Sequence, residues 1–186
     1  MHKLIFIKTA FDQYWNNLIN VIPSFIFLML LGIFCLGTVL IIILKGVRTG
    51  FQNISRLVLF EIIFIIYCST VIYRNSIDLL KYNFHPFWSY AAIKDGKVDL
   101  LDENIMNVFV FLPVGLLIGA GFPKWPWWKA IGLGCLFSIS IELLQFILKR
   151  GFSEVDDVIH NSLGCIFGYL FVKMLYFFYS VFDKLR

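Results

Sequence analysis

Long apolar runs separated by short polar stretches make up most of the chain. A helix needs about 20 apolar residues to cross a bilayer core of roughly 30 Å. Five runs approach that length, at about Ile22–Leu44, Leu57–Tyr73, Asn104–Phe122, Trp127–Leu148 and Val158–Phe182. Strands of membrane barrels instead alternate polar and apolar residues over about ten positions. The pattern therefore predicts an all-α fold, a polytopic membrane helix bundle with about five transmembrane helices.

Residues 1–21 follow a different pattern, with apolar and polar positions on opposite faces of one helix. The apolar face carries Leu4, Ile7, Phe11, Tyr14, Trp15 and Leu18. This amphipathic spacing is typical of a helix that lies in the membrane interface. We therefore expect an interfacial helix over residues 1–21 and a single transmembrane domain over residues 22–186.

The composition supports a membrane protein and excludes several other classes. Of 186 residues, 60% are hydrophobic and 15% are charged, against about 45–50% and about 25% in globular domains. The net charge is only +4, and basic residues are scattered among the connections, so no nucleic-acid partner is expected. The four cysteines lie in apolar runs without paired spacing, which indicates packed thiols. We expect no metal site and no cofactor.

Polar residues gather where four of the predicted helices meet one membrane face. Five spans place the end of the second, the start of the third, the end of the fourth and the start of the fifth at that face. Spacings of three or four residues put many of these side chains on shared helical faces. The resulting ligand-binding candidates are Arg74, Asp78, Asn104, Asn107, Glu142, Gln145, Arg150, Asp156, Asp157 and Asn161.

Glu142 stands out because it lies roughly 9 Å below Leu148 along the predicted helix. A carboxylate at membrane depth costs about 2.5–3.5 kcal/mol on insertion scales, so we expect it to face the bundle with Arg150 or Arg74 as partner. The alternative is a buried pair that only fixes helix packing.

The other polar candidates leave two interpretations open. Asp156 is expected mainly as a helix cap, and Asp157 is either a cap or a site residue. Asn107 and Asn161 either join helices through hydrogen bonds or orient a polar ligand. The pairs Gly115–Gly119 and Gly164–Gly168 predict close helix contact.

Four stretches in order along the chain resemble the VanZ-like family of bacterial membrane proteins. Residues 83–87 resemble its N-x-x-P-F motif, and residues 104–115 resemble its N-x-x-x-F-x-P-x-G helix. Residues 138–145 match S-x-x-x-E-x-x-Q, and residues 150–169 match R-x-F-x-x-x-D-D-x-x-x-N-x-x-G-x-x-x-G-Y. Arg74 fits the arginine after the second helix. The resemblance covers about residues 67–169.

The resemblance implies a multi-pass protein of the bacterial cell membrane. The family takes its name from a protein that gives low-level resistance to teicoplanin, a lipid-bearing glycopeptide antibiotic. The expected function is therefore glycopeptide resistance through a polar pocket at one membrane face. That pocket would bind a lipid headgroup, a cell-wall precursor or the drug, so the expected partners are membrane lipids and lipid-linked or lipoglycopeptide molecules.

The alternative is an intramembrane enzyme that acts on a lipid-linked or anionic lipid substrate. Glu142 or Asp157 would then serve as acid or base, with Arg74 and Arg150 holding the anionic group. The sequence contains no nucleophile motif, so catalytic residues stay unassigned and binding is the first interpretation. Basic residues divide almost evenly between the two faces, but the short basic connection 45–56 favours an outside N-terminus and an inside C-terminus.

Overall fold

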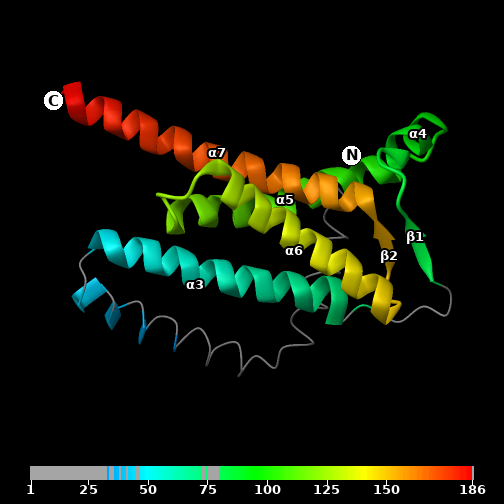
Figure 1. Cartoon of the computed structure of the whole chain (residues 1–186), viewed down its shortest axis with the longest axis horizontal. Helices are drawn as coiled ribbons and strands as arrows, with labels where there is room; N and C mark the ends of the chain where they lie inside the picture. The colour runs from blue at the N-terminus through cyan, green and yellow to red at the C-terminus, as the bar shows by residue number, and fades with distance from the viewer. Residues whose placement is uncertain are drawn as a thin grey trace, which may run out of the picture.

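The computed structural model describes residues 33, 36–37, 39–40, 42–44, 47–72, 74 and 80–185. In chain order its elements are α3 (Val47–Tyr67), the π-helical turn η1 (Cys68–Ile72), β1 (Lys81–Asn83), α4 (Trp88–Lys94), α5 (Asp99–Gly121), α6 (Trp127–Leu148), β2 (Phe152–Glu154) and α7 (Val155–Leu185). The long helices form a bundle, with β1, β2 and α4 gathered at one end (Figure 1).

The predicted all-α membrane bundle is confirmed. Among the described residues, four helical segments are long and apolar enough to cross a membrane: Gly50–Ile72, Asp99–Gly121, Trp127–Leu148 and Val155–Lys184. The predicted interfacial helix at residues 1–21 lies outside the described residues, as does most of the first predicted span, Ile22–Leu44. Large apolar side chains such as Phe60, Leu136 and Phe167 are more than half exposed on the outer surface, as expected where a protein faces acyl chains.

The predicted start of the second span was wrong, because α3 begins at Val47 rather than near Leu57. Most of the basic connection expected at residues 45–56 is therefore helical. Its polar side chains are accommodated by local bonds: Ser55 Oγ donates to the carbonyl of Phe51 at 2.9 Å. Arg56 Nε donates to the carbonyl of Gly121 at the end of α5, also at 2.9 Å.

Helices α5 and α7 pack closely together, and glycines make this approach possible. A β-carbon on Gly164 would lie 2.1 Å from the Val108 carbonyl oxygen, and one on Gly168 would lie 2.1 Å from that of Leu112. A β-carbon on Gly115 would lie 2.0 Å from the carbonyl oxygen of Cys165. The close helix contact predicted from the glycine pairs is confirmed.

Two of the polar stretches between the predicted spans contain regular structure that brings them together. The connection between the second and third spans contains β1 and α4, and the connection after α6 contains β2. The two strands pair in parallel, with Lys81 opposite Phe152 and Asn83 opposite Glu154. Helix α6 stops because Lys149 and Gly151 adopt positive φ values of 53° and 102°, which turns the chain sharply into β2.

Candidate functional site

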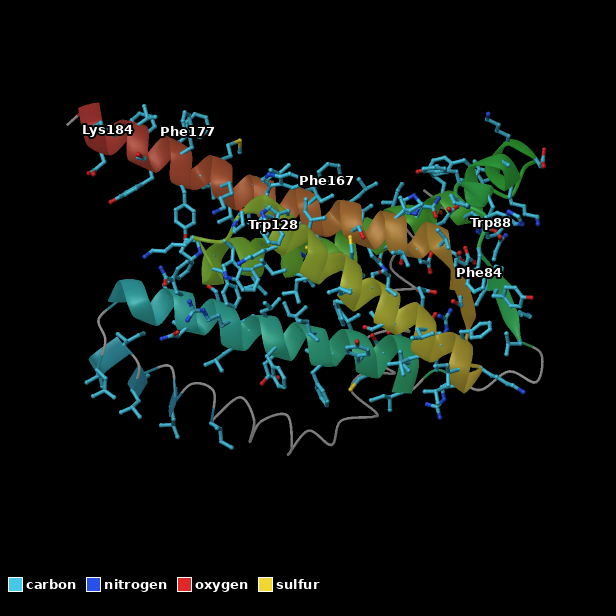
Figure 2. All side chains as sticks on the ribbon, in the orientation of Figure 1. Phe84, Trp88, Trp128, Phe167, Phe177 and Lys184 are labelled. Atoms are coloured by element: carbon cyan, nitrogen blue, oxygen red, sulfur yellow. The ribbon has the colours of Figure 1, made fainter. Side chains whose placement is uncertain are left out.

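The structure describes all but one of the polar residues singled out from sequence, and these gather at one end of the bundle. At this end η1, the start of α5, the end of α6 and the start of α7 meet β1, β2 and α4. We call this region the polar end. Phe84 and Trp88 lie there, whereas Phe177 and Lys184 lie at the far end of α7 (Figure 2). Side-chain bonds between these elements, described next, hold the polar end together.

Glu142 is buried on α6, with 7% of its surface exposed. Its Oε2 accepts a hydrogen bond from the backbone N–H of Glu154 at 2.8 Å. Its own backbone carbonyl accepts one from Ser153 Oγ at 3.1 Å. Glu142 therefore fastens β2 to α6, while none of the described residues donates to its second carboxylate oxygen.

Of the two arginines expected as partners of Glu142, Arg74 acts on it electrostatically, whereas Arg150 binds elsewhere. Arg150 Nη1 donates instead to the carbonyl of Val71 at 3.1 Å and to that of Ile72. A π-helical turn such as η1 leaves carbonyls without intrahelical donors at its end, and the guanidinium of Arg150 fills this need. Arg150 thus anchors the end of the second span.

Asp157 and Asn161 lie on one face of α7 and reach two different helices. Asn107 Nδ2 on α5 donates to Asp157 Oδ1 at 2.7 Å. Asn161 Nδ2 donates to Ser138 Oγ on α6 at 2.9 Å. Asn161 is buried between α6 and α7, and its bond to Ser138 explains its place there by helix packing alone. In contrast, the second carboxylate oxygen of Asp157 receives no hydrogen bond from any described residue.

Asp156 has a different role from its neighbour Asp157. Its carboxylate is fully buried and accepts bonds from the backbone N–H of Phe87, the backbone N–H of Ser89 and the Ser89 hydroxyl. Asn104 Nδ2 completes this cluster by donating to Ser89 Oγ at 3.0 Å. The cap expected from Asp156 therefore exists, but it serves the first turn of α4 rather than α7.

Glu154 is a buried acid that the sequence analysis did not single out. Its Oε2 accepts a bond from the indole Nε1 of Trp88 at 3.0 Å. Burial, reinforced by the nearby negative charge of Asp157, raises the pKa of Glu154 to about 8. Glu154 lies within the motif at residues 150–169 that resembles the family, but at a position where the motif allows any residue. Its neighbours become visible only through the pairing of β1 with β2.

Arg74 lies beside these acids and forms no ion pair with any residue that the structure describes. No hydrogen bond joins its exposed guanidinium to the described part of the chain. Its positive charge nevertheless acts on both Glu142 and Asp157. Within the described ranges, therefore, the donors of Arg74 have no acceptor, in contrast to those of Arg150.

Two further buried side chains have one polar atom each without a partner. Gln145 donates through Nε2 to the Thr70 carbonyl at 3.1 Å, while its Oε1 is unpaired among the described atoms. His160 shares a hydrogen bond with the Tyr90 hydroxyl through Nε2 at 2.9 Å, while its Nδ1 has no partner in the described part of the chain. No group of three or more metal-binding side chains suited to an ion occurs in the described ranges.

Most of the predicted site residues therefore come to the same end of the bundle. Glu142, Gln145, Arg150, Asp156, Asp157 and Asn161 lie there with Arg74, Asn104 and Asn107. Asp78 lies outside the described residues. The contacts divide this set into two groups. Asn104, Arg150, Asp156 and Asn161 hold elements together. Polar atoms of Arg74, Glu142, Gln145 and Asp157 have no partner among the described residues.

Comparison with known proteins places this site within a family. The model of the family described as VanZ/LLP1 matches residues 54–178. The chain belongs to the VanZ/LLP1 family. This VanZ-like region is wider than the stretch 67–169 recognised from motifs, and it contains the complete set of predicted site residues.

One characterised relative supports the assignment. Over 72 residues, the chain is 33% identical to Protein VanZ of Enterococcus faecium; the alignment covers 39% of this chain and 43% of that protein. The chain thus matches less than half the length of that VanZ protein. No solved structure matches the chain. Together with the four apolar helices, the family match establishes a VanZ-like membrane protein.

Proposed function

We propose that this VanZ-like protein lowers the sensitivity of a bacterium to teicoplanin-type glycopeptides by binding a membrane-anchored ligand at its polar end. The ligand is the polar part of a lipid, of a lipid-linked cell-wall precursor or of the drug itself. The resistance role comes from the resemblance to the family, and the location comes from the arrangement of the polar residues.

One observation supports the polar end as the binding site. Glu142 and Asp157 are each held by one hydrogen bond to a neighbouring element, and each keeps a second oxygen without a donor among the described residues. Acids placed at membrane depth are expensive, and such residues commonly mark ligand or ion sites. A ligand that donates hydrogen bonds to these oxygens offsets that cost.

Binding is favoured over catalysis by the state of the neighbouring hydroxyls. Ser89 Oγ donates to Asp156, Ser138 Oγ accepts from Asn161, and Ser153 Oγ donates to the Glu142 carbonyl. Each of these hydroxyls is part of a structural contact, and none of the three donates to the side-chain carboxylate of Glu142 or Asp157 as a base-activated nucleophile would. Glu142 and Asp157 remain the acid–base pair of the enzymatic alternative, which predicts turnover of a bound lipid by the purified protein.

The test is expression of the chain in a teicoplanin-susceptible Gram-positive host, with teicoplanin and vancomycin susceptibility measured side by side. We expect the wild-type chain to raise the inhibitory concentration of teicoplanin more than that of vancomycin, which carries no acyl chain. Glu142→Gln and Asp157→Asn keep the side-chain shape and remove the charge, so both should abolish this effect at equal protein abundance.

Asp183→Asn is the matched control, because Asp183 is an exposed acid at the far end of α7. It should leave the phenotype unchanged. If the wild-type chain gives no shift, or if Glu142→Gln and Asp157→Asn behave like Asp183→Asn, the proposed function is wrong.

A further inference from the structure

The guanidinium of Arg74 lies flat against the backbone of Gly151. A β-carbon built on Gly151 would lie 2.7 Å from Arg74 Nη1, 2.8 Å from Cζ and 2.9 Å from Nε. Because these three atoms of one plane are nearly equidistant from that position, the face of the guanidinium covers the side of Gly151 from which a side chain would project. Gly151 is therefore required both for its φ of 102° and for the space that Arg74 occupies.

This position fixes the arginine while leaving its donors free. A guanidinium presents its N–H groups at its edge, and stacking on a backbone face uses none of them. None of the residues in the described part of the chain accepts a bond from Arg74, although its charge acts on Glu142 and Asp157. The group is thus pre-positioned to accept an anion from outside the protein.

The charges around Arg74 restrict which anion fits. Glu142 and Asp157 face the same region, and Glu103 also acts electrostatically on Asp157. Arg150 does not balance these acids at close range, because its Nη1 is bound to Val71 and Ile72 carbonyls. The carboxylates of Glu142 and Asp157 beside Arg74 disfavour a polyanion at this arginine, since like charges repel strongly where water is scarce.

We propose that the polar end binds a headgroup with a single phosphate, held by Arg74, and with N–H or O–H donors that bind the free oxygens of Glu142 and Asp157. This inference rests on the proposed function and specifies its ligand. Two sources share this chemistry: a glycerophospholipid such as phosphatidylethanolamine, and a sugar joined to a polyprenyl chain through one phosphate.

The test is native mass spectrometry of the full chain in detergent with defined lipids. Phosphatidylethanolamine and phosphatidylcholine of equal acyl length both carry one phosphate, but only the former has N–H donors, so we expect it to bind more tightly. N-acetylglucosamine linked to undecaprenol through one phosphate tests the second source. Whichever of this lipid and phosphatidylethanolamine binds more tightly is identified as the source of the ligand. Farnesyl pyrophosphate tests the polyanion and should bind most weakly.

Variants separate the arginine from general surface charge. Arg74→Ala should weaken phosphatidylethanolamine binding about tenfold, equivalent to about 1.4 kcal/mol. Gly151→Ala should also weaken it with the net charge unchanged, because the β-carbon displaces the guanidinium; a thermal-unfolding measurement confirms that this variant is folded. Lys97→Ala removes one exposed positive charge near α4 and should leave binding unaltered.

Equal binding of phosphatidylcholine and phosphatidylethanolamine would overturn the inference, as would tightest binding of farnesyl pyrophosphate or equal effects of Arg74→Ala and Lys97→Ala. These failures are distinct from failure of the proposed function. If headgroup selectivity is absent but glycopeptide sensitivity still depends on Glu142 and Asp157, only the ligand assignment is wrong. If headgroup selectivity is present but no drug phenotype is found, only the proposed function is wrong.

Discussion

At the scale of single residues, the adjacent acids Asp156 and Asp157 have different roles because they lie on different faces of α7. Asp156 points to the first turn of α4 and receives three donors from Phe87 and Ser89. Asp157 points to α5 and receives one donor from Asn107. Phe87 has a positive φ of 63°, which is unusual for a bulky residue, and the bond to Asp156 holds its backbone in that conformation.

The first prediction compares Asp156→Asn with Asp157→Asn, which remove the same charge from neighbouring positions. Hydrogen bonds to charged groups contribute about 1.5–3 kcal/mol each, so Asp156→Asn should destabilise the protein by about 3 kcal/mol. Asp157→Asn should cost less than about 1 kcal/mol, because an amide oxygen can still accept the Asn107 bond. Thermal unfolding in detergent measures both. Equal losses would show that the two acids do not have separate roles.

The second prediction concerns the pH dependence that Glu154 contributes. Its pKa rises from an ordinary value of 4.5 to about 8 in the folded protein because it is buried. A raised pKa in an acid means that the protonated form favours folding, so this contribution is present below about pH 4.5 and is lost as the pH rises through about 8.

Glu154→Gln should therefore flatten the decline of the melting temperature between these pH values, since a glutamine oxygen can still accept the bond from Trp88. The measurement is the melting temperature of both proteins in the same detergent across the pH range. An unchanged slope in the variant would mean that Glu154 does not titrate with folding.

At the scale of elements, helix ends were predicted correctly where residues next to them in the sequence stop or start a helix. Helix α6 has the predicted bounds, because Pro126 precedes it and Lys149 ends it in a left-handed conformation. The start of α3 was misplaced because Asn53, Ser55 and Arg56 interrupt the apolar pattern; Arg56 is satisfied by Gly121, which is remote in sequence.

The same reasoning explains which parts of the site could be predicted. Helical spacing and the order of the spans brought Asn107, Glu142, Asp157 and Asn161 to one end. The bonds of Asp156 to α4 and of Glu154 to Trp88 depend on the pairing of two three-residue strands. Strands that short carry no usable pattern, so these contacts required the structure.

The third prediction tests the glycine contact between α5 and α7. A β-carbon on Gly164 or Gly168 would overlap a backbone carbonyl of α5, and the helices must then separate along their length. Gly164→Ala should therefore cost about 3 kcal/mol, the upper part of the usual cost of over-packing. Gly132→Ala on α6 is the matched control, because nothing lies within 4 Å of its β-carbon position.

Alanine favours a helix by up to about 1 kcal/mol over glycine, so Gly132→Ala should leave stability equal or slightly higher. The fraction of folded monomer surviving a heat step, measured by fluorescence-detected size exclusion, compares the two variants. Similar behaviour of both would show that the close approach of α5 and α7 does not limit stability.

At the scale of the whole molecule, the two ends of the bundle differ in charge. The polar end contains Glu142, Glu154, Asp156 and Asp157. The opposite end is the turn between α5 and α6, where Arg56 Nε binds the carbonyl of Gly121 at 2.9 Å and Lys173 Nζ binds that of Pro123 at 2.6 Å. Lysines at positions 124 and 129 are exposed at the same end.

The fourth prediction concerns the orientation of the bundle in the membrane. Basic residues near membrane ends favour the cytoplasmic side, whereas acids have little effect. Basic residues divide almost evenly between the two ends, so the short basic stretch at residues 45–56, whose Arg56 binds Gly121 at the α5–α6 turn, decides the orientation: this turn should face the cytoplasm and the polar end the exterior. In a chain whose native cysteines are replaced, Lys97→Cys should react with a membrane-impermeant maleimide in intact cells. Lys124→Cys should react only after permeabilisation. The reverse pattern would place the polar end inside, where the free oxygens of Glu142 and Asp157 could not meet an extracellular glycopeptide.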